Sequence, residues 1–126
     1  MNKKTTTRTG EFSLDENGIL IVKVLDGSFI DLDDAIDNSL VVRQITGNKP
    51  RLKLWDLRVN WKITKEAREY LLKEDVPGRT IARAVIVKSL ANKLISNFLL
   101  KFNKSRTPLK IFLDEKEALE WLRSCK

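Results

Sequence analysis

The chain has 126 residues, with 24 Lys and Arg against 17 Asp and Glu, a formal net charge of +7, no histidine and one cysteine. Domains usually hold about 100–150 residues, so a chain of this length has the size of one domain. The lack of histidine excludes Ser-His-Asp and Cys-His nucleophiles and the usual zinc sites, and the lone Cys125 cannot form a disulfide within the chain, which is typical of a reducing compartment.

The first structured segment is predicted to be a β-hairpin. Residues 11–15 alternate polar and apolar side chains, and residues 19–25 continue as an apolar strand. Between them, Asn17 and Gly18 are the residue types that supply the two positive φ angles of a type I′ turn.

The rest of the chain alternates helices and strands. Each predicted helix begins at a capping residue, namely Asp31, Thr64, Ser89 or Asp114, and repeats apolar residues every three or four positions. The β-branched run at 81–87 has the composition of a strand that is covered on both faces. The predicted segments are helices at 31–46 and 64–74, a helix from 89 to the break at Thr107-Pro108, a helix from 114 onward, and strands at 51–57, 81–87 and 109–113.

This alternation predicts an α/β domain with a mixed five-stranded sheet, an N-terminal antiparallel hairpin followed by parallel strands, and about four helices. We expect residues 11–126 to form this single domain and residues 1–10, which are rich in Thr, to form a disordered tail. No apolar segment follows the basic start, and none reaches the ~20 residues of a membrane span. We therefore expect a cytoplasmic protein.

Two segments are similar to a known family: Leu-Trp-Asp-Leu-Arg at 54–58, and the run at 111–122 that begins Ile-Phe-Leu-Asp-Glu. They resemble uncharacterised, bacterial-type SpoIIAA-like proteins of the STAS superfamily, over about residues 11–123. The resemblance implies the SpoIIAA-like fold. In the phosphoswitch members, the anti-anti-sigma factors, an Asp-Ser-Ser-Gly-type motif follows this strand, and phosphorylation of its serine controls partner binding.

That phosphoswitch motif is missing here. Residues 60–66 contain one hydroxyl side chain, that of Thr64. Thr64 is therefore a weak candidate phosphoacceptor, and a helix N-cap is the more common role for such a residue.

Ligands of open α/β sheets bind outside the carboxyl ends of the parallel strands. The loops after the second, third and fourth predicted strands are thus the expected site for a ligand or a partner. Trp61 is expected in an exposed loop, where it either binds a partner or caps the edge of the core. The candidate binding residues are Asp26, Ser28, Arg58, Asn60, Trp61, Lys88 and Ser89.

Signals for catalysis and metal binding are weak. Four aspartates at 31, 33, 34 and 37 allow a metal site, but their spacing is that of the first turns of a helix, where carboxylates are favoured by the helix dipole. No glycine-rich phosphate loop occurs. We expect no metal, no cofactor and no enzymatic activity.

Charge is segregated along the chain. Residues 11–48 hold eight acidic and two basic residues, whereas residues 49–110 hold 16 basic and five acidic ones. Lys93, Lys101 and Lys104 form a basic face on the predicted third helix. Such a face is either solvated or attracts nucleic acid or an anionic membrane surface, and the acidic and basic regions could also be complementary surfaces of a complex.

The sequence therefore favours a non-enzymatic module that binds a protein partner or a small anionic ligand. The alternative is a binder of nucleic acid or anionic lipid through residues 49–110. On the third predicted helix, Leu99 and Leu100 add more apolar surface than one stripe requires. This surplus predicts either a homodimer or packing beneath the C-terminal helix beside Trp121.

Overall fold

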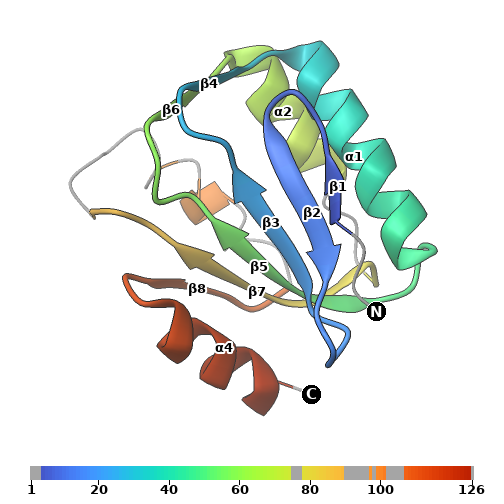
Figure 1. The fold of residues 1–126 in the computed structure, drawn as a ribbon, viewed down its shortest axis with the longest axis vertical. Helices are drawn as coiled ribbons and strands as arrows, with labels where there is room; N and C mark the ends of the chain where they lie inside the picture. The colour runs from blue at the N-terminus through green and yellow to red at the C-terminus, as the bar shows by residue number, and fades with distance from the viewer. Residues whose placement is uncertain (1–3, 75–77, 90–96, 98, 102–106, 126) are drawn as a thin grey trace.

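The computed structural model describes residues 4–74, 78–89, 97, 99–101 and 107–125. Its main sheet has six strands in the order β1-β2-β3-β5-β7-β8, and a second, small sheet pairs β4 with β6 (Figure 1). The strands are β1 Lys4–Thr6, β2 Gly10–Leu14, β3 Leu20–Val24, β4 Ser28–Ile30, β5 Arg51–Asp56, β6 Trp61–Ile63, β7 Thr80–Ile86 and β8 Leu109–Phe112. The helices with described bounds are α1 Leu32–Thr46, α2 Lys65–Glu74 and α4 Glu115–Ser124.

The sheet is mixed, as predicted. Strands β1, β2 and β3 are antiparallel, whereas β3, β5, β7 and β8 run parallel. All five predicted strands are present, which confirms the α/β class. The sixth strand β1 and the β4–β6 pair were not predicted, because three-residue strands carry too short a pattern to be recognised.

The expected disordered tail is wrong for residues 4–10. Lys4–Thr6 pair with Glu11–Ser13 as strand β1, and Thr9 is 1% exposed. The Thr7 hydroxyl accepts a hydrogen bond from the Gly10 N–H at 3.1 Å, which closes the turn between β1 and β2. Threonine favours strands, so a Thr-rich segment beside a neighbouring strand can pair with it without an apolar pattern of its own.

The hairpin between β2 and β3 is present, but its turn is not type I′. Gly18 has a φ of 78°, and Asn17 does not have a positive φ. Asp15 organises a three-residue loop: its carboxylate accepts from the Asn17 and Ile19 N–H groups, both at 2.9 Å, and its carbonyl accepts from Gly18 at 3.0 Å. A loop of this length needs only one left-handed residue, which Gly18 supplies.

The predicted helix caps are confirmed where the structure describes them. Asp31 and Asp34 form a reciprocal capping box at the start of α1, and Gly47 ends the helix in the left-handed conformation with a φ of 62°. Thr64 Oγ1 accepts from the Ala67 N–H at 3.1 Å at the start of α2. The Asp114 side chain accepts from the Glu117 N–H at the start of α4.

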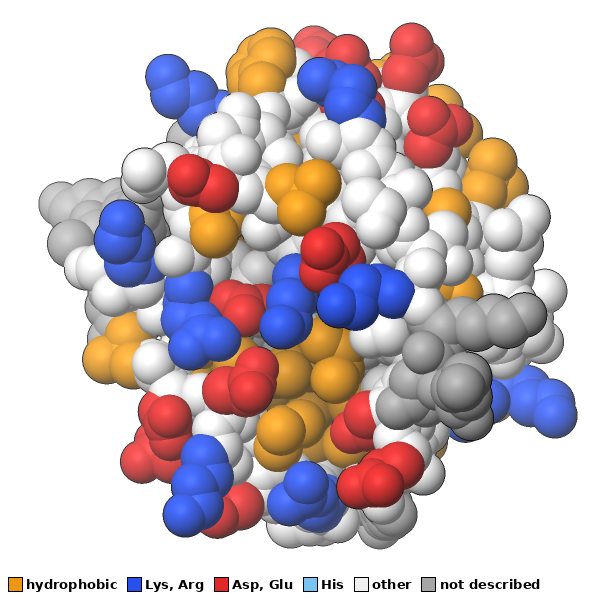
Figure 2. Space-filling view, in the orientation of Figure 1, with side chains coloured by type: hydrophobic (Ala, Val, Ile, Leu, Met, Phe, Trp, Pro, Cys, Tyr) orange, Lys and Arg blue, Asp and Glu red, His pale blue; other side chains and the backbone are white. Residues whose placement is uncertain are grey.

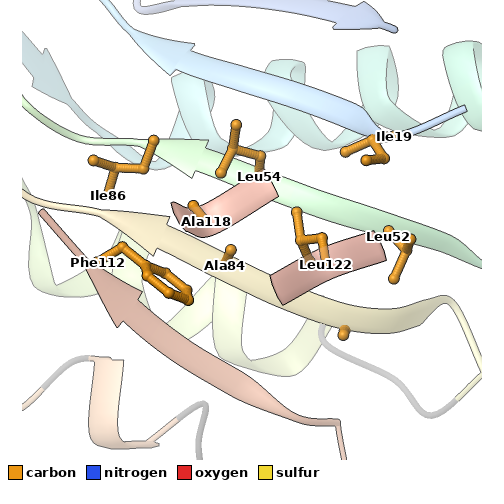
Figure 3. Close-up of a cluster of buried hydrophobic side chains, with 9 residues drawn as sticks. Ile19, Leu52, Leu54, Ala84, Ile86, Phe112, Ala118 and Leu122 are labelled. Atoms are coloured by element: carbon orange, nitrogen blue, oxygen red, sulfur yellow. The ribbon is translucent and has the colours of Figure 1, made fainter. Parts of the chain in front are cut away.

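One face of the sheet is apolar and closely packed. Leu52 and Leu54 of β5 and the small Ala82 and Ala84 of β7 lie against Leu122 of α4 (Figure 3). Each of these side chains is buried. Small residues on β7 let α4 approach the sheet closely, and the side chains between them are buried.

The opposite face is covered by α1 and α2 (Figure 1). Leu99 also lies here: it is 1% exposed and packs with Leu57, Val85 and Val87. The expectation that Leu99 or Leu100 packs beneath the C-terminal helix beside Trp121 is therefore wrong for Leu99, which lies on the other side of the sheet. Leu100 is 53% exposed.

Some expectations lie outside the described residues. They include most of the predicted helix after Ser89, together with Lys93 and Lys104 of its basic face; Lys101 is described, helical and exposed. In the part of the chain that is described, none of the helices has the length and apolar character needed to cross a bilayer.

The capping box makes the start of α1 a test of the fold. Asp31→Ala removes the acceptor for the Asp34 N–H, and we expect it to lower the free energy of unfolding by about 1 kcal/mol. Asp37→Ala, on an exposed turn of the same helix, is the control and should cost nothing measurable, because alanine is the better helix former. Urea denaturation followed by circular dichroism measures both, and equal effects of the two variants would contradict the capping role.

Candidate ligand-binding cavity

The sequence-predicted site at the carboxyl ends of the strands is only partly assembled. Asp26 Oδ1 accepts from the Asn60 N–H at 3.1 Å, and the Asn60 carbonyl accepts from the Gly27 N–H at 2.6 Å. These contacts join the loop after β3 to the loop before β6. The Asp26 carboxylate therefore serves the backbone of a neighbouring loop, which is a structural role.

Arg58 forms ion pairs with carboxylates at the same edge of the sheet. Its guanidinium donates to both oxygens of Asp56, at 2.9 and 2.8 Å, and lies 3.7 Å from Glu115. Burial raises the pKa of Asp56, but the hydrogen bonds from Arg58 and the charges of Arg58 and Lys23 together lower it more, so the pKa of this carboxyl lies below its ordinary value. The same hydrogen bonds raise the pKa of Arg58. With one guanidinium beside two carboxylates, this cluster carries a net negative charge and does not attract an anion.

The remaining predicted residues do not converge with these. Lys88 and Ser89 are exposed after β7, and the Ser28 hydroxyl donates to the Thr9 carbonyl at 3.4 Å. Trp61 is not in an exposed loop, as the sequence suggested, but on β6, where it is partly buried. It packs against two clusters of apolar side chains and lines a cavity.

That cavity was not predicted from the sequence. It lies between the sheet and the helices α1 and α2, with a volume of about 160 Å³. Side chains of β2, β3 and β5 form its floor, and α1 and α2 form its roof, so segments between residues 9 and 83 meet around it. Its apolar wall includes Phe12, Val22, Val24, Ile30, Leu57 and Ile63.

The two ends of the cavity differ in charge. At the carboxyl ends of the strands, the wall is mostly apolar and includes Trp61, with Thr9 and Asn38 as its polar members. At the amino ends, it is made by Lys49 before β5, Arg79 before β7 and Arg43 near the end of α1. The cavity therefore has an apolar end and a cationic end.

Two further cations lie on the floor of the cavity. Lys53 of β5 and Arg83 of β7 are partners in the parallel register and lie on the same face of the sheet. Arg83 is 3% exposed, and its guanidinium carbon lies 4.4 Å from the centre of the Trp55 ring, a cation–π distance. The sequence does carry a signal for this wall, since Arg51 and Lys53 alternate with leucines in β5 and Arg83 stands among apolar residues in β7.

One carboxylate among the described lining residues accompanies these five cations. Glu74 Oε1 accepts from the Ser39 hydroxyl at 3.0 Å and from the Tyr70 hydroxyl at 3.2 Å, and it also pairs with Arg43. Glu74 thereby ties α2 to α1 and neutralises one of the five. The described lining keeps a positive excess.

The segment before β2 closes the side of the cavity next to α1. Asn38 of α1 donates to Thr9 Oγ1 at 2.9 Å and accepts from the Thr7 hydroxyl at 2.6 Å. Arg8 donates to both carboxylate oxygens of the buried Asp34 and to the Phe29 carbonyl. The hydrogen bond from Arg8 holds the pKa of Asp34 below its ordinary value and raises the pKa of Arg8.

These contacts also show where the aspartates of α1 lie. Asp31 and Asp34 cap the helix, and Asp34 pairs with Arg8, whereas Asp33 and Asp37 are exposed. Within the described residues, no three His, Cys, Asp or Glu side chains are grouped as metal ligands.

Comparison with known proteins identifies the family. The family described as "Domain of unknown function (DUF7793)" matches residues 12–126. The chain belongs to the DUF7793 family. No curated protein matches it.

The fold of this DUF7793 chain is SpoIIAA-like. It is similar to the crystal structure of an uncharacterised protein of the DUF3478 family from Shewanella loihica PV-4, which has a SpoIIAA-like fold. The two share 15% sequence identity with a TM-score of 0.62, over 97% of this chain and 92% of that one. This likeness bears on the fold and confirms the resemblance seen in the sequence.

The Arg8–Asp34 pair predicts a dependence of stability on pH. Because the folded-state pKa of Asp34 is lowered, the pair stabilises the fold above the carboxyl's unfolded pKa of about 3.9, and this contribution is lost as the pH falls through the folded-state pKa. Arg8→Gln should therefore lower the free energy of unfolding at pH 7, and the difference from the parent should shrink below about pH 4.

Urea denaturation between pH 3 and pH 7 measures this difference. Arg123→Gln is the control, because Arg123 is exposed on α4 and the substitution changes the net charge equally. An effect of Arg8→Gln that stays constant down to pH 3 would contradict the role given to the ion pair.

Proposed function

We propose that this chain is a non-enzymatic binding module that holds a small organic ligand in the cavity between the sheet and helices α1 and α2. The observation that carries the proposal is the cavity itself, with about 160 Å³ lined by apolar side chains and, at one end, by cations. Native cores are close-packed, and voids larger than a water molecule are few in each domain. A cavity of this size with a few polar groups at one end has the character of a ligand site.

The charge of the wall supports an anionic ligand. Five described lining residues carry a positive charge and one, Glu74, carries a negative charge. Burying cations costs free energy, and an anion placed among them would offset that cost. This argument agrees with the expectation of a small anionic ligand, but it places the charge at the amino ends of the strands and not at their carboxyl ends.

The alternative, binding of nucleic acid or an anionic membrane through residues 49–110, has less support. Lys49, Lys53, Arg79 and Arg83 belong to this basic region and line the cavity. On the face shown in Figure 2, Lys and Arg side chains are mixed with Asp and Glu around an apolar patch, so that face is not continuously basic. Binding along a phosphate backbone needs a basic surface or stripe.

A protein partner remains a separate candidate, which the exposure of Leu100 favours. This side chain is 53% exposed beside the exposed Lys101. If it lies in a homodimer contact, the mass from sedimentation should rise with concentration in the micromolar range, and Leu100→Lys should reduce that rise. A mass that stays at the monomer value would remove the dimer.

The cavity proposal is tested by filling the cavity. Val42 lines it and the adjacent Val41 does not, so Val42→Phe and Val41→Phe make the same change on one helix, inside and outside the site. We expect indole, a small neutral probe, to shift amide NMR signals of cavity-lining residues in the parent and in Val41→Phe, and not in Val42→Phe. Circular dichroism checks that both variants fold.

Two results would overturn the proposal. Indole that leaves the lining amides of the parent chain unchanged at millimolar concentration would show that the cavity is not accessible. Shifts that persist in a folded Val42→Phe variant would place the binding elsewhere.

A further inference from the structure

Resting on the proposed function, we infer that the ligand is a small monocarboxylate with one ring or an equally compact apolar body. Its carboxylate lies at the amino ends of β5 and β7, between Lys49 and Arg79, and its body points toward Trp55 and Trp61. Three observations carry this: the volume of the cavity, the chemistry along its length, and the state of the two cations at its charged end.

The volume sets the size of the ligand. An apolar cavity of about 150 Å³ is large enough to admit benzene. Pockets for drug-sized ligands hold roughly 300–1,000 Å³. At about 160 Å³, this cavity takes the body of a one-ring molecule and excludes a long acyl chain or a nucleotide.

The chemistry along the cavity sets the orientation. Trp55 and Trp61 present aromatic rings to the cavity, and Leu57 and Val24 complete the apolar end at the carboxyl ends of the strands. A planar apolar body gains most against such rings. Its charged group then lies at the other end, where the cations are.

Lys49 and Arg79 differ in their contacts from Arg43, the third cation at this end of the cavity. Arg8, Arg43 and Arg58 each pair with a carboxylate. Among the described residues, neither Lys49 nor Arg79 forms an ion pair, and both line the cavity where β5 and β7 begin. Lys49 is exposed, so the charged group of the ligand meets solvent at this end. A monoanion suits the site better than a dianion, because the desolvation cost beside an apolar wall rises with charge.

The test compares benzoate with benzamide, which has nearly the same shape and no charge. We expect benzoate to bind about three- to tenfold more tightly at low salt, because exposed ion pairs contribute little each and two are available. NMR titration of the cavity-lining amides gives both dissociation constants. In the double variant Lys49→Gln with Arg79→Gln, the two compounds should bind equally.

The control is the double variant Lys116→Gln with Arg123→Gln. It changes the net charge by the same amount on exposed positions of α4, on the other side of the sheet, and it should keep the preference for benzoate. Circular dichroism verifies that each variant is folded.

Several results would overturn the inference. Equal affinities of benzoate and benzamide in the parent chain would contradict the inference that the ligand carries a carboxylate. Tighter binding of decanoate or 2-naphthoate than of benzoate would contradict the inferred limit on ligand size. A preference for benzoate that survives in the Lys49 and Arg79 double variant would remove the assigned head-group site. In each of these cases binding to the cavity amides persists, so the proposed function stands, whereas the absence of binding by every probe overturns both.

Discussion

The two faces of the adjacent strands β5 and β7 have opposite chemistry, and the rest of the structure follows from this constraint. Successive side chains of a strand point to opposite sides of the sheet. Leu54 and Ala84 therefore face α4, while Lys53 and Arg83 face α1 and α2. A helix can pack closely on alanines and leucines, but not on two long cations beside a tryptophan. For this reason the first face is covered by closely packed apolar side chains, and the second borders the cavity.

Most of the fold was predictable, because it depends on local signals. The capping box of Asp31 and Asp34 and the left-handed Gly47 mark both ends of α1. The run of β7 identifies a strand covered on both sides, and the parallel order follows from strands that alternate with helices. Strand β1 was missed because its pairing with β2 depends on backbone hydrogen bonds, which leave little trace in side-chain patterns.

The candidate site was less predictable, because a cavity is a property of packing between distant segments. Ligands of open α/β sheets bind at the carboxyl ends of parallel strands, and this rule predicted a site at Asp26, Arg58 and Asn60. The polar groups of these residues instead bond to neighbouring loops and carboxylates. Trp61 was singled out as a candidate binding residue and lines the cavity, but it was expected in an exposed loop and lies partly buried on β6. The basic excess of residues 49–110 was recognised as a surface feature, although the alternation of Arg51, Lys53 and Trp55 with leucines already indicated that some of it lies on a buried face.

The contacts of Thr9 and Arg8 bear on where this domain begins. The family match starts at residue 12, yet Thr9 is buried in the cavity wall and Arg8 pairs with Asp34 of α1. A recombinant fragment cut at the family boundary would lack strand β1 and would expose the backbone hydrogen-bonding groups of β2 as a free sheet edge. Such edges pair with other chains, so a truncated fragment would be prone to aggregate. The folded domain therefore reaches further toward the N-terminus than the segment that the family shares.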